Sequence, residues 1–422
     1  MADDLQDIVD NLAERLQRSV AIDDPHIRLL AASRHFGDED ATRVSSVLNR
    51  SVDPQLCEQI LAQGIAHWTT PGRVIVPLEG ALPRLCIPIR CTGLLLGYLW
   101  LIDAGATLGG QDQDVAREAA GHAGVVLYRR LIVHERSRAR HEAILRELVA
   151  TDRAIRSQAA DDLRAEQLFP ATGMYFQVLG MRHQGPDGIA APQTVAMEAA
   201  VEDAQTWMSQ RSAAPACALT ATNKSRAWLM LAQPQPPSRQ ELDTICGRLT
   251  ARFDRLTQDG DRLVLGIGGL AHHIEDIAES YRQAFLAVRA AQLVPSIGPG
   301  ACWDELGPYQ LLLKMPTEDL LAAAQVPALV ALEREDGNRG LVATLEAFLD
   351  NAGDVARTAR HLNVHRATLY HRLKRIEQLT GCELSQGDDR LTLHLGLKLR
   401  NLAAAHRNET AGGKPARIRS VS

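Results

Sequence analysis

The sequence predicts a multidomain protein of the α+β class, and three observations support this prediction. A chain of 422 residues is long for one hydrophobic core, so roughly two to four domains are expected. Runs rich in β-forming residues alternate with helical patterns in the segments 73–103 and 175–267. The C-terminal part is expected to be all-α, and it contains a compact basic segment at 354–380.

Composition and charge argue against several other classes of protein. Hydrophobic residues make up 45% of the chain, which favours folded domains over disorder. The start, MADDLQDIVD, lacks the basic region and apolar core of a signal peptide. The longest nearly apolar run, 93–102, is about half of a membrane span. Seven Cys with scattered spacing are typical of a reducing compartment, so we expect a cytoplasmic, nucleoid-associated protein without a membrane partner.

Residues 1–130 are expected to form an α/β domain. Apolar residues at helical spacing and one long helical stretch predict helices at 5–16, 39–63 and 111–130. β-rich runs separated by Pro and Gly predict strands at 27–32, 73–77, 85–90 and 94–103. Cys86 and Cys91 raise the alternative of a redox pair or metal site. Their separation is not a standard zinc spacing, and two small residues on neighbouring strands are the expectation.

A helical linker is predicted over 131–165, because the preceding helix continues through His141 to Val149 with few breakers. Several apolar residues could form a seam with a second copy of this helix, although His134 and Arg138 interrupt it: Leu127, Leu131, Leu145, Leu148 and Val149. A signalling helix that pairs in a dimer and an ordinary connecting helix both fit the pattern.

A second α+β domain is predicted over 166–300. Strands are expected at 175–180, 216–221, 225–232 and 262–267, and helices at 195–208, 242–256 and 277–292. The two middle strands flank Thr222-Asn223-Lys224 and are expected to form a hairpin. Gly266, Gly268 and Gly269 lack the spacing of a phosphate-binding loop, so they are interpreted as glycines at a tight turn. A segment rich in Pro and Gly then marks a boundary, and 301–340 is expected to be a connector.

The basic segment carries the strongest functional signal. From Val355 to Ile376 it contains six Arg or Lys, three His and no acidic residue, while the whole chain has a net charge of −5. The rest of the protein therefore sums to −11. A basic island on an acidic protein is typical of a module that binds nucleic acid.

The apolar pattern of the same segment predicts a helix-turn-helix. Asp354 is expected to cap a first helix, and Asn363 falls where a tight turn needs a residue that tolerates left-handed geometry. Small Ala359 allows close packing of a second helix, whose inner face carries Leu369, Leu373 and Ile376. The alternative is a solvated basic helix in an ordinary bundle. After the motif, the leucines of 391–399 fit a strand and a helix equally well by spacing alone.

Three regions of the sequence resemble known domains. AFLDN, TARHLNVHRATLYHRLKRIEQLTG and DDRLTLHLGLKL together resemble the C-terminal domain of PucR/CdaR-type transcription regulators, which implies a helix at 391–399. LGIGG followed by SYRQA is similar to the degenerate cyclase-type (GGDEF-like) domain in the middle of CdaR-like regulators. The run 85–103 resembles the central hairpin of a GAF domain, a small-molecule sensor fold. The implied order is a GAF-like domain, the linker, the cyclase-like domain, the connector, a helix-turn-helix domain over 341–405 and a disordered basic tail over 406–422.

The helix 365–380 is expected to enter the major groove of double-stranded DNA. Candidates for contact with base edges or nearby phosphates lie in its first turns: His365, Arg366, Thr368 and Tyr370. Candidates for backbone phosphate lie further along it and on the preceding helix: Arg372, Lys374, Arg375, Arg357 and Arg360. A homodimer or higher homo-oligomer and a small-molecule effector are the other expected partners.

Two rival functions also fit parts of the sequence. A working diguanylate cyclase needs glycines and metal-binding carboxylates at its hairpin tip, and here the tip reads Ala221-Thr-Asn-Lys-Ser225. His361, His365 and His371 have no complete set of metal ligands around them, and no other catalytic motif is present in the sequence. We therefore expect no catalytic residues, cofactor or metal. The second rival is a sensor or scaffold whose C-terminal helices bind protein.

Overall fold

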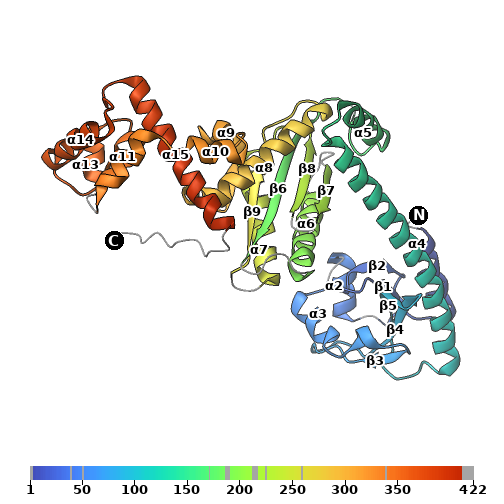
Figure 1. Ribbon diagram of the computed structural model, residues 1–422. Helices are drawn as coiled ribbons and strands as arrows, with labels where there is room; N and C mark the ends of the chain where they lie inside the picture. Colours follow the sequence, from blue (N-terminus) through green and yellow to red (C-terminus); the bar gives the residue numbers. More distant parts are fainter. Residues whose placement is uncertain are drawn as a thin grey trace. The chain divides into compact units, whose positions relative to one another are not determined.

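The computed structural model describes residues 3–38, 40–49, 52–170, 172–185, 191–211, 217–223, 226–257, 260–337 and 340–410 (Figure 1). The chain divides into two compact units, Met1–Ala139 and Arg140–Ser422. Each unit contains one five-stranded sheet, and the second also contains the C-terminal helices. The predicted class, multidomain α+β, is confirmed.

Unit 1 is built on a sheet with the strand order β2-β1-β5-β4-β3. All neighbouring strands run antiparallel, and β4 and β5 form the predicted hairpin. The strand bounds are β1 Val20–Asp23, β2 Leu29–Ala32, β3 Gly72–Val74, β4 Arg84–Cys91 and β5 Leu94–Ile102. The GAF-like identity of this unit stays a prediction.

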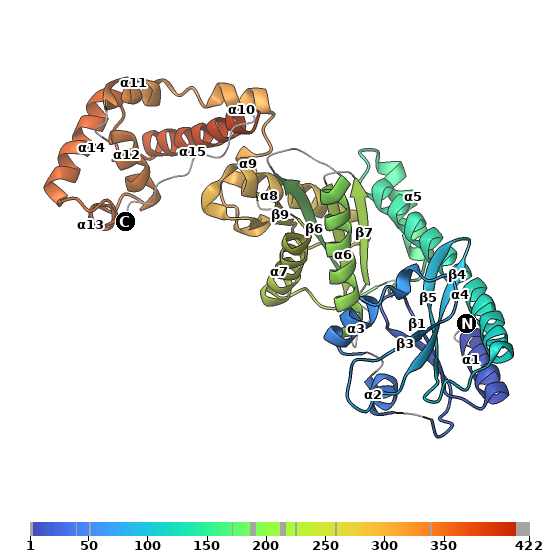
Figure 2. The same ribbon diagram turned by 90° about the horizontal axis from the view of Figure 1, so that it is seen from below.

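Helices cover both faces of this sheet (Figure 2). Their bounds are α1 Asp3–Leu16, α2 Ala41–Asn49, α3 Pro54–Leu61, η1 Ile65–His67 and α4 Gly110–Leu148. One face packs against α1 and the first half of α4, and the other packs against α3 and η1. Strand β1 alternates accordingly, because Val20 and Ile22 face the first layer and Ala21 faces the second.

The structure of unit 1 differs from the prediction at three places. Strand β1 was not predicted, because its four residues follow directly on the long first helix. The predicted helix over 39–63 is two helices, and Pro54 begins the second because its ring cannot continue the first. Cys86 and Cys91 lie on one strand rather than on neighbouring strands, and both thiols are free. Cys86 is buried.

The 39-residue helix α4 starts in unit 1 and ends in unit 2. The predicted long helix is confirmed, but its leucines do not form one seam. Leu145 and Leu148 are 0% and 1% exposed, and they pack in the core of unit 2 with Ile144. They are therefore not available to pair with a second copy of α4. Helix α5, Arg153–Ala165, contributes three further buried residues to the same core.

Unit 2 contains a sheet with the strand order β10-β9-β6-β8-β7, in which only β10 and β9 run parallel among the described strands. The strands are β6 Tyr175–Gln184, β7 Cys217–Asn223, β8 Arg226–Gln233, β9 Arg262–Ile267 and β10 Gly300–Cys302. The helices over it are α6 Ala191–Arg211, α7 Arg239–Leu256, η2 Ile274–Asp276 and α8 Ile277–Leu293. Helices α6 and α7 cover one face, and α8, α5 and the end of α4 cover the other.

The glycines of the LGIGG run allow α8 to approach the sheet closely. A Cβ on Gly266 would lie 2.2 Å from the carbonyl oxygen of Ala284, and one on Gly268 would lie 2.1 Å from that of Ser280. The Ser280 hydroxyl also accepts a hydrogen bond from the N–H of Val178 at 3.1 Å. These glycines therefore serve packing between the helix and the sheet, rather than only a turn.

The segment expected to be a boundary and connector is a packed part of unit 2. Its elements are η3 Pro295–Ile297, β10, η4 Trp303–Glu305, α9 Tyr309–Leu312, α10 Thr317–Ala323 and α11 Pro327–Asp336. Trp303, Leu313 and Leu320 share a hydrophobic core with α8 and with Leu402 near the C-terminus. Strand β10 was not predicted, because its three residues, Gly-Ala-Cys, are too few to show a period.

The remaining helices are α12 Leu341–Asp350, α13 Val355–His361, α14 Arg366–Thr380 and α15 Gly387–Thr410. Helix α15 contains the leucines of 391–399, so the helical alternative is the correct one. It also reaches into the predicted disordered tail, since residues 406–410 are helical, while 411–422 lie outside the described residues. Within the described part of the chain, no helix combines the length and apolar character that crossing a membrane requires.

Candidate nucleic-acid interface

Helix α13 begins at a cap that the sequence predicted. The Asp354 carboxylate accepts a hydrogen bond from the N–H of Arg357 at 2.9 Å, and this bond lowers the pKa of the carboxyl below its ordinary value. The cap is therefore ionised at neutral pH. The hydroxyl of Thr358, which is fully buried, donates to the Asp354 carbonyl at 2.6 Å and fixes the first turn from inside.

The turn between α13 and α14 has the predicted geometry. Asn363 has φ 51°, the left-handed conformation that Asn tolerates better than most residues. The N–H of Val364 donates to the carbonyl of Ala359 at 3.0 Å and closes the turn. Ala359 is 4% exposed and packs in the same core as Leu369. A larger residue at this position would push the two helices apart.

Helix α14 begins one residue later than predicted, with His365 as its N-cap. The ring Nδ1 of His365 accepts from the N–H of Ala367 at 3.3 Å. In the neutral ring the proton is then on Nε2, which is a donor at the exposed start of the helix. The helix ends at Gly381, whose φ of 68° and N–H bond to the Glu377 carbonyl form a left-handed cap.

The inner face of α14 is buried as predicted. Leu369, Leu373 and Ile376 pack against α11, α12 and α15 in one hydrophobic cluster that contains Leu329, Leu345 and Leu393 among others. Because these residues hold the helix on its support, they are not available for contact with a ligand.

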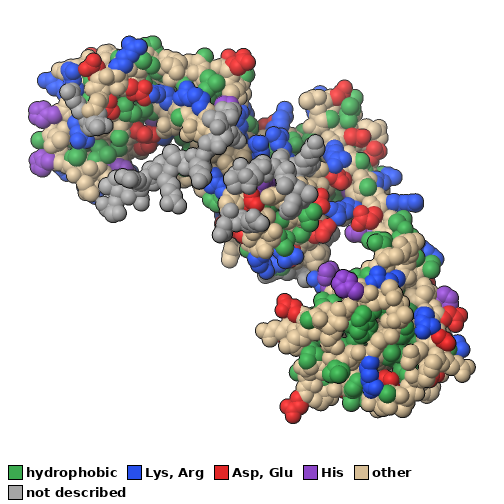
Figure 3. Space-filling view, turned by 60° about the horizontal axis from the view of Figure 1, so that its bottom comes forward, with side chains coloured by type: hydrophobic (Ala, Val, Ile, Leu, Met, Phe, Trp, Pro, Cys, Tyr) green, Lys and Arg blue, Asp and Glu red, His purple; other side chains and the backbone are tan. Residues whose placement is uncertain are grey.

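The outer face collects the predicted contact residues. Six of the predicted contact residues are exposed on α14 and at its N-cap: His365, Arg366, Thr368, Tyr370, Lys374 and Arg375. Arg357 and Arg360 are exposed on α13. Lys, Arg and His side chains lie along the edge of the part that carries α13 and α14, at the left of Figure 3. An exposed basic face, with no acidic residue between Val355 and Ile376, fits the polyanionic surface of DNA.

Arg372 is placed differently from the other arginines. It is half-buried, and its Nη1 donates to the hydroxyl of Thr344 on α12 at 3.2 Å. Arg372 therefore lies at the contact between α12 and α14. No pattern in the sequence indicates this contact, because the partner is on another helix.

Polar contacts outside the motif hold α15 against α12. One carboxylate oxygen of Asp350 accepts from the Lys398 ammonium and from the His394 ring, each at 2.8 Å. Burial raises the pKa of Asp350, but the two donors lower it by more, so its pKa lies below the ordinary value. Asn401 donates to Glu346 at 2.8 Å in the same contact. Helix α14 thus rests on α11, α12 and α15, two of which are tied together by these polar contacts.

The hairpin tip that would carry a cyclase signature is bonded to helix α4 instead. The N–H of Thr222 donates to Glu142 at 2.9 Å, and Arg146 donates to the Thr222 carbonyl at 3.0 Å. Lys224 and Ser225, which complete the tip, lie outside the described residues. No group of three metal-ligating side chains occurs among the residues that the structure describes.

Comparison with known domains decides the identity of this region. The sequence model of the PucR C-terminal helix-turn-helix domain matches residues 341–399, and that of the GGDEF-like domain matches residues 164–290. The chain carries a PucR-type helix-turn-helix domain behind a GGDEF-like domain. This is the domain combination that the sequence motifs indicated.

Two curated relatives resemble the chain along nearly its whole length. The DNA-binding transcriptional activator AdeR of Bacillus subtilis is 23% identical over 95% of this chain and 94% of its own. The proline-responsive transcriptional activator PutR of the same species is 23% identical over 94% and 96%. Among solved structures, a regulator of polyketide synthase expression from Bifidobacterium adolescentis aligns with 62% of this chain and 97% of its own, at 18% identity and a TM-score of 0.28. A score this low carries no argument about function.

Proposed function

We propose that this protein is a sequence-specific transcription regulator that binds double-stranded DNA through its PucR-type helix-turn-helix domain. The observation that carries the proposal is the division of α14 into a buried leucine face and an exposed basic face. Relatives of the PucR family, which are transcription regulators, support the same function. The protein acts in the cytoplasm, at the nucleoid.

The first turn of α14 is the part that reads DNA. Free N–H groups and the partial positive charge at a helix start favour phosphate, and the side chains there reach base edges. Arg366, Thr368 and Tyr370 contact bases, and His365 donates from Nε2 to a base or phosphate oxygen. Arg366 can bind the O6 and N7 atoms of guanine with two hydrogen bonds.

The remaining basic residues bind the sugar-phosphate backbone. Lys374 and Arg375 on α14, and Arg357 and Arg360 on α13, neutralise phosphates on either side of the groove. Arg372 is a further candidate for a phosphate contact. It also has a structural role, because its hydrogen bond to Thr344 sets the angle of α14 on α12.

The two units upstream of this domain control it. A relative that is named proline-responsive supports control by a small molecule, and the proposed GAF-like unit 1 is where that molecule binds. The GGDEF-like domain transmits the signal and has no cyclase activity, because its hairpin lacks the glycines and carboxylates of that reaction.

Binding to DNA from upstream of the protein's own gene tests the function. Fluorescence anisotropy at physiological salt should give tighter binding to that fragment than to a shuffled fragment of equal composition. Equal affinity for both would reduce the function to nonspecific DNA binding. Absence of binding to any DNA would favour the alternative in which the C-terminal helices bind protein.

A further inference from the structure

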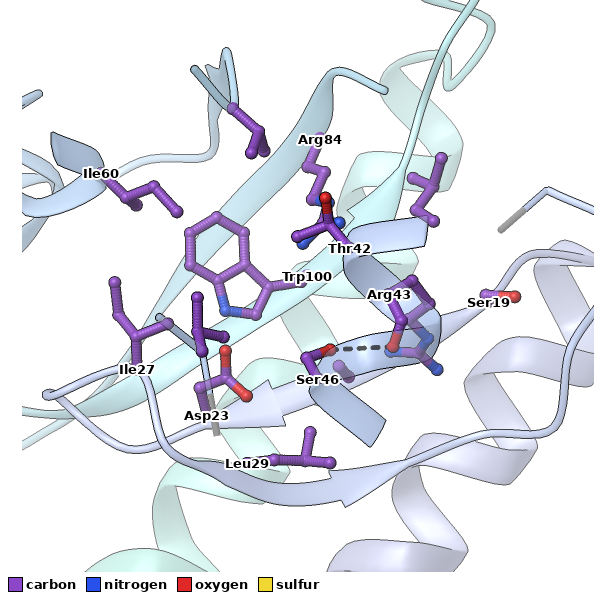
Figure 4. Close-up of a pocket in the computed structure, with 14 residues that line it drawn as sticks. Ser19, Asp23, Ile27, Leu29, Thr42, Arg43, Ser46, Ile60, Arg84 and Trp100 are labelled. Carbon is purple, nitrogen blue, oxygen red and sulfur yellow. Dashed lines mark hydrogen bonds between the residues drawn. The ribbon is translucent and has the colours of Figure 1, made fainter. Parts of the chain in front are cut away.

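Unit 1 holds a polar pocket beneath α2 and α3, on the sheet face opposite α1 (Figure 4). Its polar lining includes Asp23 on β1, Arg84 on β4, Trp100 on β5, and Thr42 and Ser46 on α2. Its apolar walls include Ile27, Leu29, Ile60 and Ile102. The cavity volume is about 30 Å³, so in this form it holds only small groups.

Asp23 is a buried acceptor in this pocket without a cation bound to it. The residue is 8% exposed, and no described residue forms an ion pair with its carboxylate. Burial raises the pKa of Asp23 to about 7, although the charges of Arg84 and Arg43 lower it. A carboxyl buried in this way is stabilised by a ligand that donates to it.

Two donors in the same pocket are not fully used. The indole nitrogen of Trp100, a residue 6% exposed, lies above the Asp23 carboxyl in Figure 4 and helps to lower its pKa, but it forms no hydrogen bond of normal geometry with any described residue. The Nε of Arg84 is also buried without a partner there. Buried donors of this kind are rare in folded proteins, and a role in binding an acceptor accounts for them.

The ion pair of Arg84 fixes its position without using Nε. Its Nη2 donates to both oxygens of Asp40, at 3.0 and 3.3 Å. Asp40 is itself held by the N–H groups of Leu82 and Arg43, at 2.8 and 2.7 Å. The guanidinium is therefore positioned by its partner in advance, and a ligand needs only to supply an acceptor.

We propose that this pocket binds a small zwitterion of amino-acid size, whose ammonium group donates to Asp23 and whose carboxylate accepts from Arg84 and Trp100. A cation alone would satisfy Asp23 but leave the Nε of Arg84 without an acceptor. An anion alone would satisfy the donors but require Asp23 to keep its proton. A molecule with both groups offers a donor to Asp23 and an acceptor to Arg84 and Trp100, and it brings no net charge into a buried site. The apolar walls then surround its side chain.

The inference deepens the proposed function and rests on it, because it names the chemical class of the effector. The helices α2 and α3 form the roof of the pocket, so a ligand larger than the present cavity must displace them. Occupation of the pocket is thereby linked to the packing of these helices on the sheet.

Thermal shift and calorimetry on the full chain test the proposal. The probes are the proteinogenic L-amino acids, each compared with molecules that keep only one of its charged groups, such as isobutylamine and isobutyrate for valine and pyrrolidine for proline. At least one amino acid should raise Tm with dose, and its matched amine and acid should not at equal concentration. If no amino acid binds at millimolar concentration, or if the single-charge molecules bind as well, the proposal is wrong.

Variants then locate the site. Asp23→Asn keeps the shape and removes the charge, and it should weaken binding of the amino acid about tenfold or more. Trp100→Phe keeps an aromatic ring and removes the donor, and it should weaken binding by a smaller factor. The matched control is Asp7→Asn, an exposed carboxylate on α1, which should bind as the wild type does. Unchanged affinity in both pocket variants, with the fold intact by circular dichroism, would overturn the assignment.

DNA binding measured on the same preparations separates this inference from the function beneath it. If the protein binds DNA but no amino acid binds to the protein, the pocket proposal alone is refuted. An amino acid that binds to a protein unable to bind DNA would refute the regulatory function and leave the pocket standing.

Discussion

At the scale of single residues, the helix-turn-helix divides its side chains by chemistry. Leu369 and Ile376 are 0% exposed in the core, while Arg366 and Lys374 face solvent. Spacing alone predicted this division, because residues three and four apart share one face of a helix. The partner of Arg372 was not predictable in this way, since Thr344 is brought to it by tertiary packing.

Arg366→Ala tests direct reading of a base. The variant should lose about 1–3 kcal/mol of binding free energy on the cognate site, and it should discriminate less between sites that differ at the contacted position. Anisotropy titrations on a set of single-base variants of the site measure both effects. An equal loss on every sequence would instead identify Arg366 as a phosphate contact.

Lys374→Ala tests contact with the backbone. Removal of one phosphate-binding charge should weaken binding to all sequences alike and make the slope of log K against log salt shallower by about one unit. Titrations at several salt concentrations give the slope. Were it unchanged, the role assigned to Lys374 would be wrong.

Asp23→Asn tests the environment of the buried carboxyl through the pH dependence of stability. The pKa of Asp23 is raised from 3.8 to about 7, so the folded protein holds this proton more tightly than the unfolded chain does. The stability that the protonated group contributes is complete below pH 3.8 and is lost as the pH rises through about 7. The charged groups that act on it are Arg84, Asp24 and Arg43, and the Trp100 N–H also lowers its pKa. The Asp23 carboxylate in turn raises the pKa of the facing thiols of Cys57 and Cys86.

The variant is neutral at every pH, so it avoids this loss. Relative to the wild type, its free energy of unfolding should change little near the acid end and rise by roughly a few kcal/mol above about pH 8. Denaturant titrations of both proteins across this range give the difference. A difference that does not vary with pH would show that Asp23 is already ionised in the folded protein near pH 5.

At the scale of elements, the sequence predicted helices and long strands better than short ones. Strand β9 and helix α8 have the predicted start, because Gly and a polar turn bound them. Strands β1 and β10 were missed, since four and three residues carry no measurable period. The burial of Leu145 and Leu148 in the core of unit 2 was not predictable either, because an apolar stripe on a helix fits a dimer seam and a domain core equally well.

Leu373→Ala tests the support of α14. Removal of a buried leucine from the cluster should lower the free energy of unfolding by about 2–5 kcal/mol. The matched control on the same helix is Tyr370→Ala, at a residue 60% exposed, which should change stability by only about 0.5 kcal/mol. Chemical denaturation measures both. Equal losses in the two variants would contradict the placement of the inner face.

At the scale of the whole molecule, the second unit is more continuous than its sequence suggests. The segment after α8 reads as a linker, yet its apolar residues form one core with α8 and α15. Composition cannot show this, because leucines that pack together, such as Leu313 and Leu402, are far apart in the sequence. The GGDEF-like domain and the helix-turn-helix domain are thereby joined through packed side chains.

A single helix-turn-helix reads few base pairs, so two copies are expected on one operator. We predict that multi-angle light scattering will give at least twice the chain mass of 46.1 kDa for the protein on DNA. A complex that contains a single chain per DNA duplex would remove the dimer from the mechanism.

The central claim is that α14 reads a DNA sequence. Selection of bound fragments from a random DNA library by the full chain, followed by sequencing, tests it most directly. The enriched sequences should contain two related half-sites spaced about one helical turn apart, and Arg366→Ala should reduce the enrichment at defined positions. A library that shows no enrichment over its starting composition would contradict the claim.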